Sequence, residues 1–357
     1  MSNSLLINLA ALMDKPTGIS TYTLNILPYL SPLDPTLLAA KTISGFTHHS
    51  IPNEMTPEQG ARGHLRRLLW TQFELGKIYR KLRSHLLFSP LPEAPLYQNC
   101  RTVVMVHDLI PLRFPDRFSP MNAYCRYYLP QVLHNATHII CNSRATASDI
   151  IDFFQIPAEK ITPILLGYNK EQFKPLHLPR SNYFLYVGRH ASYKNLHRLL
   201  EAFAKLPKDG DYELWLVGPS DRRYTPSLSD RAQELGISDR VRFRDYVSAE
   251  ELLTIINRAI AIVFPSLWEG FGLPVLEAMG CGIPVITSNC SSLPEITGDA
   301  ALLVDPYSVA EIANAMESVA ESYQFRDSLC QASLQRAKDF SWSRTGEQTC
   351  QLLQDYL

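Results

Sequence analysis

Short apolar segments recur along the whole chain, and each is followed by a stretch with the hydrophobic spacing of a helix. These segments are Leu5–Leu9, Leu86–Phe88, Val103–Val106 and His138–Cys141 in the first half, and Tyr183–Val187, Glu213–Val217, Val241–Phe243, Ala261–Phe264 and Pro284–Thr287 in the second. Continuous apolar segments, as opposed to alternating ones, are typical of strands buried on both faces. Their alternation with helices predicts an α/β protein whose parallel sheets are built from βαβ units.

A segment without helical or strand periodicity, Gly167–Arg180, divides the two series of strands. It contains two prolines, so we interpret residues 169–180 as a linker. The sequence thus predicts two Rossmann-like, doubly wound domains, one over residues 1–168 and one over residues 181–341. Open sheets of this kind bind ligands beyond the carboxyl ends of their strands, so we expect the two domains to face each other across a ligand-binding cleft.

Composition and charge fit two folded domains of different character. The chain has 357 residues, of which 46% are hydrophobic and 19% charged, enough for two sizeable cores. Residues 1–170 hold 16 Lys and Arg against 11 Asp and Glu, whereas residues 171–357 hold 18 against 24, and the formal net charge is -1. A protein that coats nucleic acid would be strongly basic, so we expect no nucleic-acid partner.

The cysteines and the apolar segments bear on the cellular compartment. The seven cysteines are scattered and form no CxxC pair, which argues against a zinc site or a disulfide framework. The first residues lack the basic start of a signal peptide, and no apolar segment approaches the ~20 residues of a membrane span. We therefore expect a cytoplasmic protein that touches the inner face of a membrane at most peripherally.

The segment Pro265–Pro284 carries the strongest chemical signal. A buried strand leads into a glycine-rich turn at Gly270 and Gly272, and the turn opens a helix. Glycines let a ligand approach the backbone closely, and the free N–H groups of a helix N-terminus suit a phosphate. Glu269 precedes the turn and Glu277 follows one to two helical turns later, so both carboxylates can face a ligand seated there.

The pattern E-G-F-G-L-P-x-L-E within this segment resembles the signature of the retaining glycosyltransferases of family 4, also called glycosyl transferases group 1, which have the two-domain GT-B fold. Other segments similar to that family follow in the family's order: Lys15–Tyr22, its first glycine loop; Val106–Pro111, its histidine motif; Tyr186–Phe203; and Pro284–Pro306. The resemblance covers nearly the whole chain. The family usually has two adjacent glycines in its first loop, whereas this chain has Thr17 and Gly18.

The resemblance implies a metal-independent, retaining transfer of a hexose from a nucleotide sugar to a hydroxyl of a glycan or lipid-linked acceptor. Polysaccharide biosynthesis, such as that of an exopolysaccharide, is the expected role. We expect no cofactor and no metal. A UDP-sugar such as UDP-glucose is favoured as the donor, and GDP-mannose is the alternative. The base of the donor is expected near Arg242–Val247, mostly on backbone groups.

The resemblance also assigns roles residue by residue. His107, Arg189, Lys194 and Glu269 are the expected catalytic residues. Arg189 and Lys194 follow the carboxyl end of a strand, where two cations can clamp a diphosphate. Glu269 is expected to bind sugar hydroxyls and Glu277 the ribose. The expected donor-binding residues are Gly18, Gly188, Arg189, Lys194, Tyr246, Glu269, Gly270, Phe271, Gly272, Leu273 and Glu277.

Other interpretations of the sequence have less support. The triplet Asp209–Gly210–Asp211 spells DxD, which in other glycosyltransferases suggests Mn²⁺; because it precedes a strand, we interpret it as a surface turn at the amino edge of a sheet. A nucleotide-sugar epimerase on the same scaffold and a catalytically idle partner in a polysaccharide assembly complex stay open. A nicotinamide dehydrogenase is not favoured, because no complete G-x-G-x-x-G opens either half.

Two further helical segments are expected in the N-terminal domain, one within residues 1–168 and one from the end of the chain. In the region from His64 to Leu87 apolar positions partly follow a helical spacing, and only Glu74 opposes seven nearby cations: Arg62, Arg66, Arg67, Lys77, Arg80, Lys81 and Arg83. The region either binds an anionic membrane surface near a lipid-linked acceptor or is an ordinary amphipathic helix with a solvated basic face. The resemblance implies that the last helix, residues 342–357, crosses back to the N-terminal domain.

Overall fold

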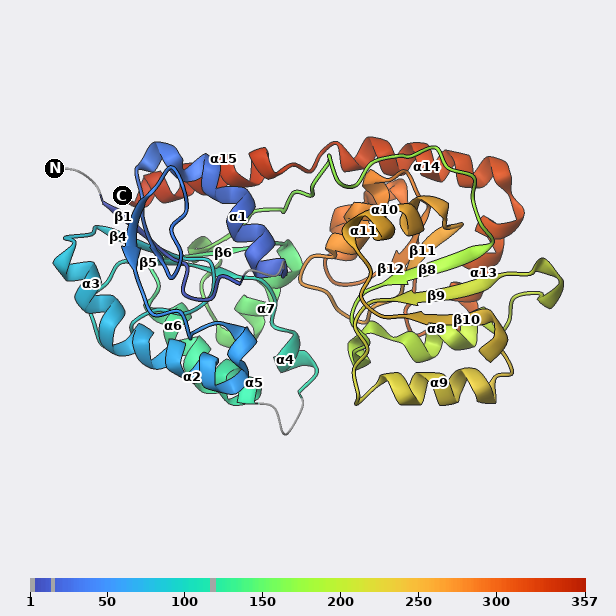
Figure 1. Cartoon of the computed structure of the whole chain (residues 1–357), viewed down its shortest axis with the longest axis horizontal. Helices are drawn as coiled ribbons and strands as arrows, with labels where there is room; N and C mark the ends of the chain where they lie inside the picture. Colours follow the sequence, from blue (N-terminus) through green and yellow to red (C-terminus); the bar gives the residue numbers. More distant parts are fainter. Residues whose placement is uncertain (1–3, 14–16, 116–119) are drawn as a thin grey trace. The chain divides into compact units, whose positions relative to one another are not determined.

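The computed structural model describes residues 4–13, 17–115 and 120–357. The chain divides into two compact units, Met1–Gly167 together with Trp342–Leu357, and Tyr168–Ser341. Each unit contains one wholly parallel sheet flanked by helices (Figure 1). The predicted fold class, two Rossmann-like domains with parallel sheets, is confirmed.

The sheet of the first unit has the strand order β3-β2-β1-β4-β5-β6-β7. Its strands are β1 (Leu5–Asn8), β2 (Thr36–Ala39), β3 (Thr47–Ser50), β4 (Leu86–Ser89), β5 (Thr102–Val106), β6 (His138–Cys141) and β7 (Ile161–Pro163). The four central strands are buried at every position, because helices cover both faces of the sheet. Side chains that follow β4, β5 and β6 therefore emerge together at one edge of the sheet.

Helices and helical turns surround this first sheet. They are α1 (Gly18–Leu30), η1 (Ser31–Leu33), η2 (Pro57–Gln59), α2 (Gly60–Trp70), η3 (Thr71–Leu75), α3 (Gly76–Lys81), α4 (Ile110–Arg113), α5 (Pro120–Ala123), η4 (Tyr124–Tyr128), α6 (Leu129–Asn135), α7 (Arg144–Phe154), η5 (Ala158–Lys160) and α15 (Trp342–Tyr356). The final helix α15 lies along α1 (Figure 1). The two helices approach closely at Gly346, where a Cβ atom would lie 2.4 Å from Cδ2 of Tyr29.

The sheet of the second unit has the order β10-β9-β8-β11-β12-β13. Its strands are β8 (Tyr183–Val187), β9 (Glu213–Val217), β10 (Val241–Arg244), β11 (Ala261–Phe264), β12 (Val285–Ser288) and β13 (Leu302–Val304). The first strand of the unit, β8, lies between β9 and β11, so the order reverses beside it. Such a reversal opens a crevice at the carboxyl ends of the strands, where doubly wound sheets bind their ligands.

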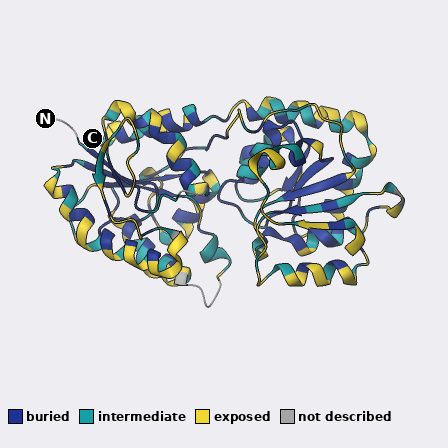
Figure 2. Cartoon of the chain, in the orientation of Figure 1, coloured by how far each residue is buried: buried dark blue, intermediate teal, exposed yellow. Residues whose placement is uncertain are grey.

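The helices of the second unit alternate with its strands. They are η6 (Ser192–Lys194), α8 (Leu196–Phe203), η7 (Lys208–Gly210), α9 (Thr225–Glu234), η8 (Ser238–Arg240), α10 (Ala249–Arg258), α11 (Leu273–Gly280), α12 (Leu293–Thr297), η9 (Gly298–Ala300), α13 (Val309–Glu321) and α14 (Tyr323–Ala337). Burial is greatest in the strands between the two helical layers (Figure 2). None of the helices in the described part of the chain is long and apolar enough to cross a membrane.

Residues 168–182, which include the predicted linker, contain no helix or strand but are fastened to the second unit. The side chain of Asn257 accepts a hydrogen bond from the amide of Leu176 (2.7 Å) and donates one to the carbonyl of Lys174 (3.1 Å). Tyr168 packs on Gly280, where a Cβ atom would lie 2.3 Å from the tyrosine ring. The segment is therefore an ordered part of the second unit.

Candidate functional site

The carboxyl edge of the second sheet begins with two glycines, one after β8 and one after β9. Gly188 donates a backbone hydrogen bond to Val217 (2.9 Å), and Gly218 has a φ of +143°. A Cβ atom on Gly218 would lie 2.2 Å from the carbonyl oxygen of Gly188. The two backbones are thus in direct contact, a closeness that only glycine permits. Gly218 is a site residue that the sequence analysis missed, although the glycine directly after a buried strand was a usable signal.

Arg189 and Lys194 lie in the loop between this glycine contact and α8. Arg189 is exposed, and its guanidinium makes no hydrogen bond with a described residue. Lys194 is buried, and its ammonium donates to Oε1 of Glu269 at 2.6 Å. An ammonium has three N–H donors, so this ion pair leaves Lys194 two donors for a ligand.

Asn195 follows Lys194 and ties two loops of this edge together. Its backbone adopts the left-handed conformation (φ 62°), and its amide donates to the carbonyl oxygens of Pro265 (3.0 Å) and Pro306 (2.6 Å). The amide of Leu267 in turn donates to the carbonyl of Tyr193 (2.7 Å). These bonds fix the loop after β8 against the loop after β11, which positions Lys194 beside Glu269. The sequence analysis did not single out Asn195.

The glycine-rich turn begins with Glu269 and ends at the start of α11. The hydroxyl of Ser292 donates to the carbonyls of Glu269 (3.2 Å) and Phe271 (2.5 Å), and these contacts fix the backbone of the turn. Gly272 has a φ of +114°, and a Cβ atom there would lie 2.9 Å from the side chain of Leu293. The helix begins at Leu273. Pro274 has no N–H, and the amides of Val275 and Leu276 donate to the carbonyl of Gly272, so the amide of Leu273 is the one of this first turn that stays available at the crevice edge of the sheet.

Glu277 is the fifth residue of α11, and its carboxylate makes no hydrogen bond or ion pair with any described residue. Burial without a partner disfavours the charged form and raises the pKa of Glu277 to about 8. At neutral pH the protonated carboxyl can both donate and accept a hydrogen bond. This half-buried carboxyl, without a hydrogen-bond partner among the described residues, is suited to paired hydroxyls such as those of a ribose.

The raised pKa of Glu277 predicts how stability depends on pH. Between pH 5 and 8 the folded protein keeps a proton that the unfolded chain releases, so the free energy of unfolding falls as pH rises, by up to about 1.4 kcal/mol per pH unit. Glu277→Gln should remove this dependence, and urea unfolding at pH 5 and 8 measures it. Equal stabilisation by the substitution at both pH values would contradict the assignment; the exposed Glu321→Gln is the control.

In the first unit, His107 directly follows β5 at the carboxyl edge of that sheet. Its Nε2 lies 2.9 Å from the carbonyl oxygen of Pro90, and the Tyr22 ring packs edge-on against it at 5.2 Å. Burial lowers the pKa of His107 to about 4 despite the hydrogen bond to Pro90, so the ring is neutral at physiological pH. With Nε2–H donated to a carbonyl, Nδ1 carries the lone pair and can accept a ligand hydroxyl.

The placement of Gly18 corrects one expectation. Gly18 does not lie in a turn: it is the first residue of α1, and an added Cβ atom would meet nothing within 4 Å. Thr17 is the N-cap, because its hydroxyl accepts from the amide of Ser20 at 3.3 Å. The amides of Gly18 and Ile19 have no partner within the helix, so they stay available to an anion or a hydroxyl. Lys15 and Pro16 of the same motif lie outside the described residues.

Tyr246 and Asp211, the last residue of the DxD triplet, lie on the surface of the second unit. Tyr246 lies after β10 and is 84% exposed, with no hydrogen bond to a described residue. The triplet lies before β9, and Asp211 is exposed in the left-handed conformation. Across the described residues, no group of three or more His, Cys, Asp or Glu side chains is arranged to hold a metal ion.

The basic region of the first unit is less exposed than the sequence suggested. Arg67 was expected among its solvated cations but is buried, with Nε and Nη2 donating to Glu93 at 2.8 and 3.0 Å and Nη1 to the carbonyl of Met55 at 2.7 Å. This partner lies outside the basic region, 26 residues further along the chain. Arg66 likewise pairs with Glu54. Fewer cations are therefore free for a partner than the sequence predicts.

Both units match models of glycosyltransferase families. The family described as Glycosyltransferase Family 4 matches residues 16–172, and the one described as Glycosyl transferases group 1 matches residues 168–336. The O-antigen chain mannosyltransferase RfbU of Salmonella typhimurium is 28% identical over 330 residues, which cover 89% of this chain and 91% of the relative. The O-antigen chain mannosyltransferase B of Escherichia coli is 31% identical over 268 residues, 70% of this chain and 69% of the relative.

Among solved structures, the sucrose-phosphate synthase of Thermosynechococcus elongatus aligns with a TM-score of 0.78 and 22% identity, over 99% of this chain and 98% of that one. At this identity the likeness concerns the fold, and it extends over both units.

Proposed function

Because the chain belongs to glycosyltransferase family 4, the group 1 glycosyl transferases of GT-B fold, we propose that it is a retaining hexosyltransferase. It moves a hexose from a nucleotide sugar to a hydroxyl of a glycan or lipid-linked acceptor during polysaccharide biosynthesis. The observation that carries this proposal is the buried Lys194–Glu269 pair at the carboxyl edge of the second sheet. A cation and an anion held side by side suit a ligand with a diphosphate and a polyhydroxylated ring.

In this proposal the diphosphate is held by three groups of the second unit. Lys194 offers its two remaining N–H donors, and Arg189 offers an exposed guanidinium that can bind two oxygens at once. The amide of Leu273 at the start of α11 is the third group, and it lies at the positive end of a helix dipole. Together these groups stabilise the charge that develops on the departing phosphate, so the proposal assigns no role to a metal ion.

The sugar and the ribose are assigned to the carboxylates. Glu269, oriented by Lys194, accepts hydrogen bonds from hydroxyls of the hexose, and Glu277 binds the ribose hydroxyls. The neutral His107 ring offers its Nδ1 lone pair to a sugar hydroxyl. A positively charged ring would oppose the developing charge of an oxocarbenium-like sugar, so the lowered pKa of His107 serves the reaction.

The proposed reaction is a substitution on one face of the sugar. The bond from C1 to the diphosphate oxygen breaks, the acceptor oxygen forms a bond to C1 on the same face, and the acceptor proton passes to the departing phosphate. No carboxylate is assigned as a nucleophile, in contrast to the retaining hydrolases. The enzyme contributes positioning and stabilisation of the leaving group.

The sugar is proposed to be mannose. Both O-antigen relatives are named mannosyltransferases, which favours GDP-mannose as the donor over the UDP-hexose that the sequence alone favours. The discriminating experiment is a thermal-shift panel with UDP, GDP, ADP, UDP-glucose and GDP-mannose, each with and without EDTA. A ligand at 100 times its Kd should stabilise the protein by about 2.7 kcal/mol.

Each outcome of this panel is informative. If GDP and GDP-mannose stabilise the protein and EDTA leaves the shift unchanged, the proposal is supported. If UDP alone stabilises it, the donor is a UDP-hexose and the assignment of GDP-mannose is wrong. Loss of the shift with EDTA contradicts metal independence. If no nucleotide stabilises the protein, the transferase proposal fails and a catalytically idle partner in polysaccharide assembly takes its place. An epimerase would convert the donor sugar without any acceptor, which product analysis detects.

We also propose that the first unit rests on an anionic membrane that carries the acceptor. The helical stretch from α2 through α3 exposes Leu65 (58%), Leu69 (50%) and Phe73 (62%) at a spacing of four residues, so they share one face. Exposed Arg62 and Lys81 lie near the two ends of this stripe. Apolar side chains between cations match the boundary between anionic headgroups and acyl chains.

Vesicle sedimentation of the whole chain tests this membrane contact. Leu65→Ser combined with Leu69→Ser and Phe73→Ser should lower binding to phosphatidylglycerol-containing vesicles at least tenfold, because the apolar face is lost. The matched control replaces Leu303 and Tyr323, exposed side chains of the second unit, by serine. Equal binding of both variants, or equal binding of the wild type to purely zwitterionic vesicles, would contradict the proposal.

A further inference from the structure

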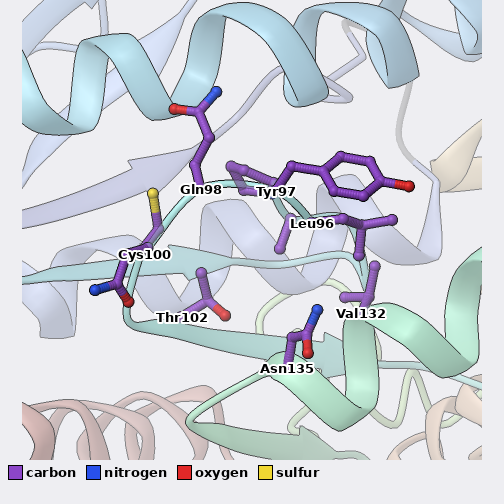
Figure 3. Close-up of a pocket in the computed structure, with 10 residues that line it drawn as sticks. Leu96, Tyr97, Gln98, Cys100, Thr102, Val132 and Asn135 are labelled. Atoms are coloured by element: carbon purple, nitrogen blue, oxygen red, sulfur yellow. The ribbon is translucent and has the colours of Figure 1, made fainter.

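A cavity of about 460 Å³ opens in the first unit beside the loop that joins β4 to β5. Figure 3 shows Leu96 and Tyr97 on one side of it and Thr102, Val132 and Asn135 on the other. The volume lies in the range of small-molecule sites, about 300–1,000 Å³. The lining of the cavity includes neither Gly18 nor His107, the residues of this unit that the sequence assigns to the donor.

The position of the cavity separates it from His107. Thr102 begins β5, and His107 directly follows the end of that strand. A strand of this length spans about 15 Å, so the cavity and His107 lie toward opposite edges of one rigid sheet. A polymer of sugars that reached from one edge to the other would need several residues.

The loop that forms the cavity is fastened by side chains although it has no regular structure. Gln72 accepts a hydrogen bond from the amide of Leu96 (2.9 Å) and donates to the carbonyl of Ala94 (3.0 Å). The hydroxyl of Tyr128 also donates to Ala94 (3.0 Å), and that of Tyr124 donates to the carbonyl of Pro92 (3.0 Å). The cavity is therefore formed before any ligand arrives.

The side chains that fasten the loop come from unusual elements. Gln72 belongs to η3 and the two tyrosines belong to η4, which are the two π-helical turns within the described ranges. A π-helical turn costs regular helical hydrogen bonding and is frequently kept at functional sites. Gly76 adds to the arrangement, because a Cβ atom there would lie 2.0 Å from Oε1 of Gln98. Side chains from the two π-helical turns, η3 and η4, thus fasten the same loop between β4 and β5.

The lining of the cavity is uncharged. Its ten residues are Ala94, Pro95, Leu96, Tyr97, Gln98, Asn99, Cys100, Thr102, Val132 and Asn135. Burial raises the pKa of the Cys100 thiol, which keeps it protonated. An anionic ligand such as a nucleotide would find no cation among these ten residues. Amide groups, a hydroxyl and an aromatic ring instead match the hydroxyls and the apolar ring face of a neutral sugar.

Tyr97 is the most distinctive member of the lining. It is 86% exposed and lies between two held neighbours: the amide of Leu96 donates to Oε1 of Gln72 (2.9 Å), and the side-chain amide of Gln98 donates to the carbonyl of Gln72 (3.1 Å). A tyrosine side chain has few rotatable bonds, so an exposed ring between two held neighbours loses little conformational entropy when a ligand stacks on it. Asn135, at the last turn of α6, is also exposed and makes no hydrogen bond with a described residue.

We propose that this cavity is a second carbohydrate site, which holds a neutral segment of the glycan away from the hydroxyl that receives the sugar. The proposal rests on the proposed function in one respect, the assignment of the acceptor as a glycan. Tyr97 stacks on one sugar ring, and Asn135 and Thr102 hydrogen-bond to its hydroxyls. By retaining a long chain between additions, the site raises the affinity for long acceptors over short ones.

Saturation-transfer NMR on the whole chain without any nucleotide tests the site directly. The probes are linear α-mannotetraose, maltotetraose and the anionic tetragalacturonate. The wild type should bind at least one neutral tetrasaccharide, and Tyr97→Ala and Asn135→Ala should each weaken that binding at least fivefold. Tyr127→Ala, another exposed tyrosine of this unit that lies outside the cavity, is the matched control.

Three outcomes would overturn the proposal: no binding of either neutral probe, binding that Tyr97→Ala leaves unchanged, or equal dependence of tetragalacturonate binding on Tyr97. A transfer assay adds a second readout, in which Tyr97→Ala should raise KM for a long acceptor and leave kcat and the KM for a short acceptor unchanged. Because the NMR measurement uses no donor, it separates the two proposals. Tyr97-dependent glycan binding in a protein that binds no nucleotide would reject the transferase and keep the site.

Discussion

Lys194→Ala is expected to lower kcat at least about 100-fold, the usual scale for removing one preorganised electrostatic contact at a reacting group. The lysine supplies the buried positive charge at the carboxyl edge of the second sheet, where the diphosphate is proposed to leave. Turnover is measured as release of the nucleoside diphosphate from the donor that the thermal-shift panel identifies. Because the interaction grows as the phosphate departs, kcat should fall more than the affinity for the donor.

The same substitution is also expected to destabilise the fold, since it leaves the buried carboxylate of Glu269 without its partner at 2.6 Å. Breaking a buried ion pair from one side costs on the order of 3–5 kcal/mol, whereas removing both charges costs much less. Lys194→Ala combined with Glu269→Ala should therefore unfold at a higher temperature than Lys194→Ala alone and still be inactive. Such a result separates the loss of turnover from the loss of stability.

Lys205→Ala is the matched control, because Lys205 is exposed just after α8. It should keep the wild-type kcat and melting temperature. A Lys194→Ala enzyme with more than about a tenth of wild-type turnover would contradict the assignment. So would a double variant that regains activity together with stability.

All nine predicted strands are present, and eight of them lie inside the sheets, where burial on both faces produces an apolar pattern; the ninth, β10, is an edge strand. The interior strand β2 was missed although three of its four residues are buried. The missed strands are β2, β3, β7 and β13, of which β3, β7 and β13 lie at sheet edges. Strand β3 has the sequence Thr-His-His-Ser, and β7 ends in proline, so neither carries an apolar pattern. Their pairing depends on the neighbouring strand.

The candidate site shows the same division between local and long-range information. The pattern around Gly270 and Gly272 predicts the start of α11, because glycine and proline act on the local backbone. The pairing of Lys194 with Glu269 cannot be predicted from local sequence, since 75 residues separate them. The buried pair of Arg67 and Glu93 could not be predicted for the same reason, so the sequence predicted more exposed cations in the first unit than the structure has. Residue type predicts which groups can react, and the fold decides which of them meet.

The contact between the strand-end glycines yields the second large expected effect, which concerns Gly218→Ala. The new Cβ atom would lie 2.2 Å from the carbonyl oxygen and 2.8 Å from the carbonyl carbon of Gly188. Both neighbours are backbone atoms, so no side chain can move aside, and a φ of +143° is itself unfavourable for alanine. The ends of β8 and β9 must separate, which should lower the free energy of unfolding by at least about 3 kcal/mol.

Gly236→Ala separates the clash at Gly218 from the cost of the backbone conformation, because Gly236 also has a positive φ (+64°) but has open space around its Cα. That variant should lose only about 1 kcal/mol, the cost of a left-handed alanine. Thermal and urea unfolding measure both. In the fraction of Gly218→Ala protein that folds, the loop carrying Arg189 and Lys194 is displaced, so nucleotide binding should weaken as well. If the two variants are equally stable, the ends of β8 and β9 can separate without loss of free energy. Gly218 would then have no part in positioning the donor site.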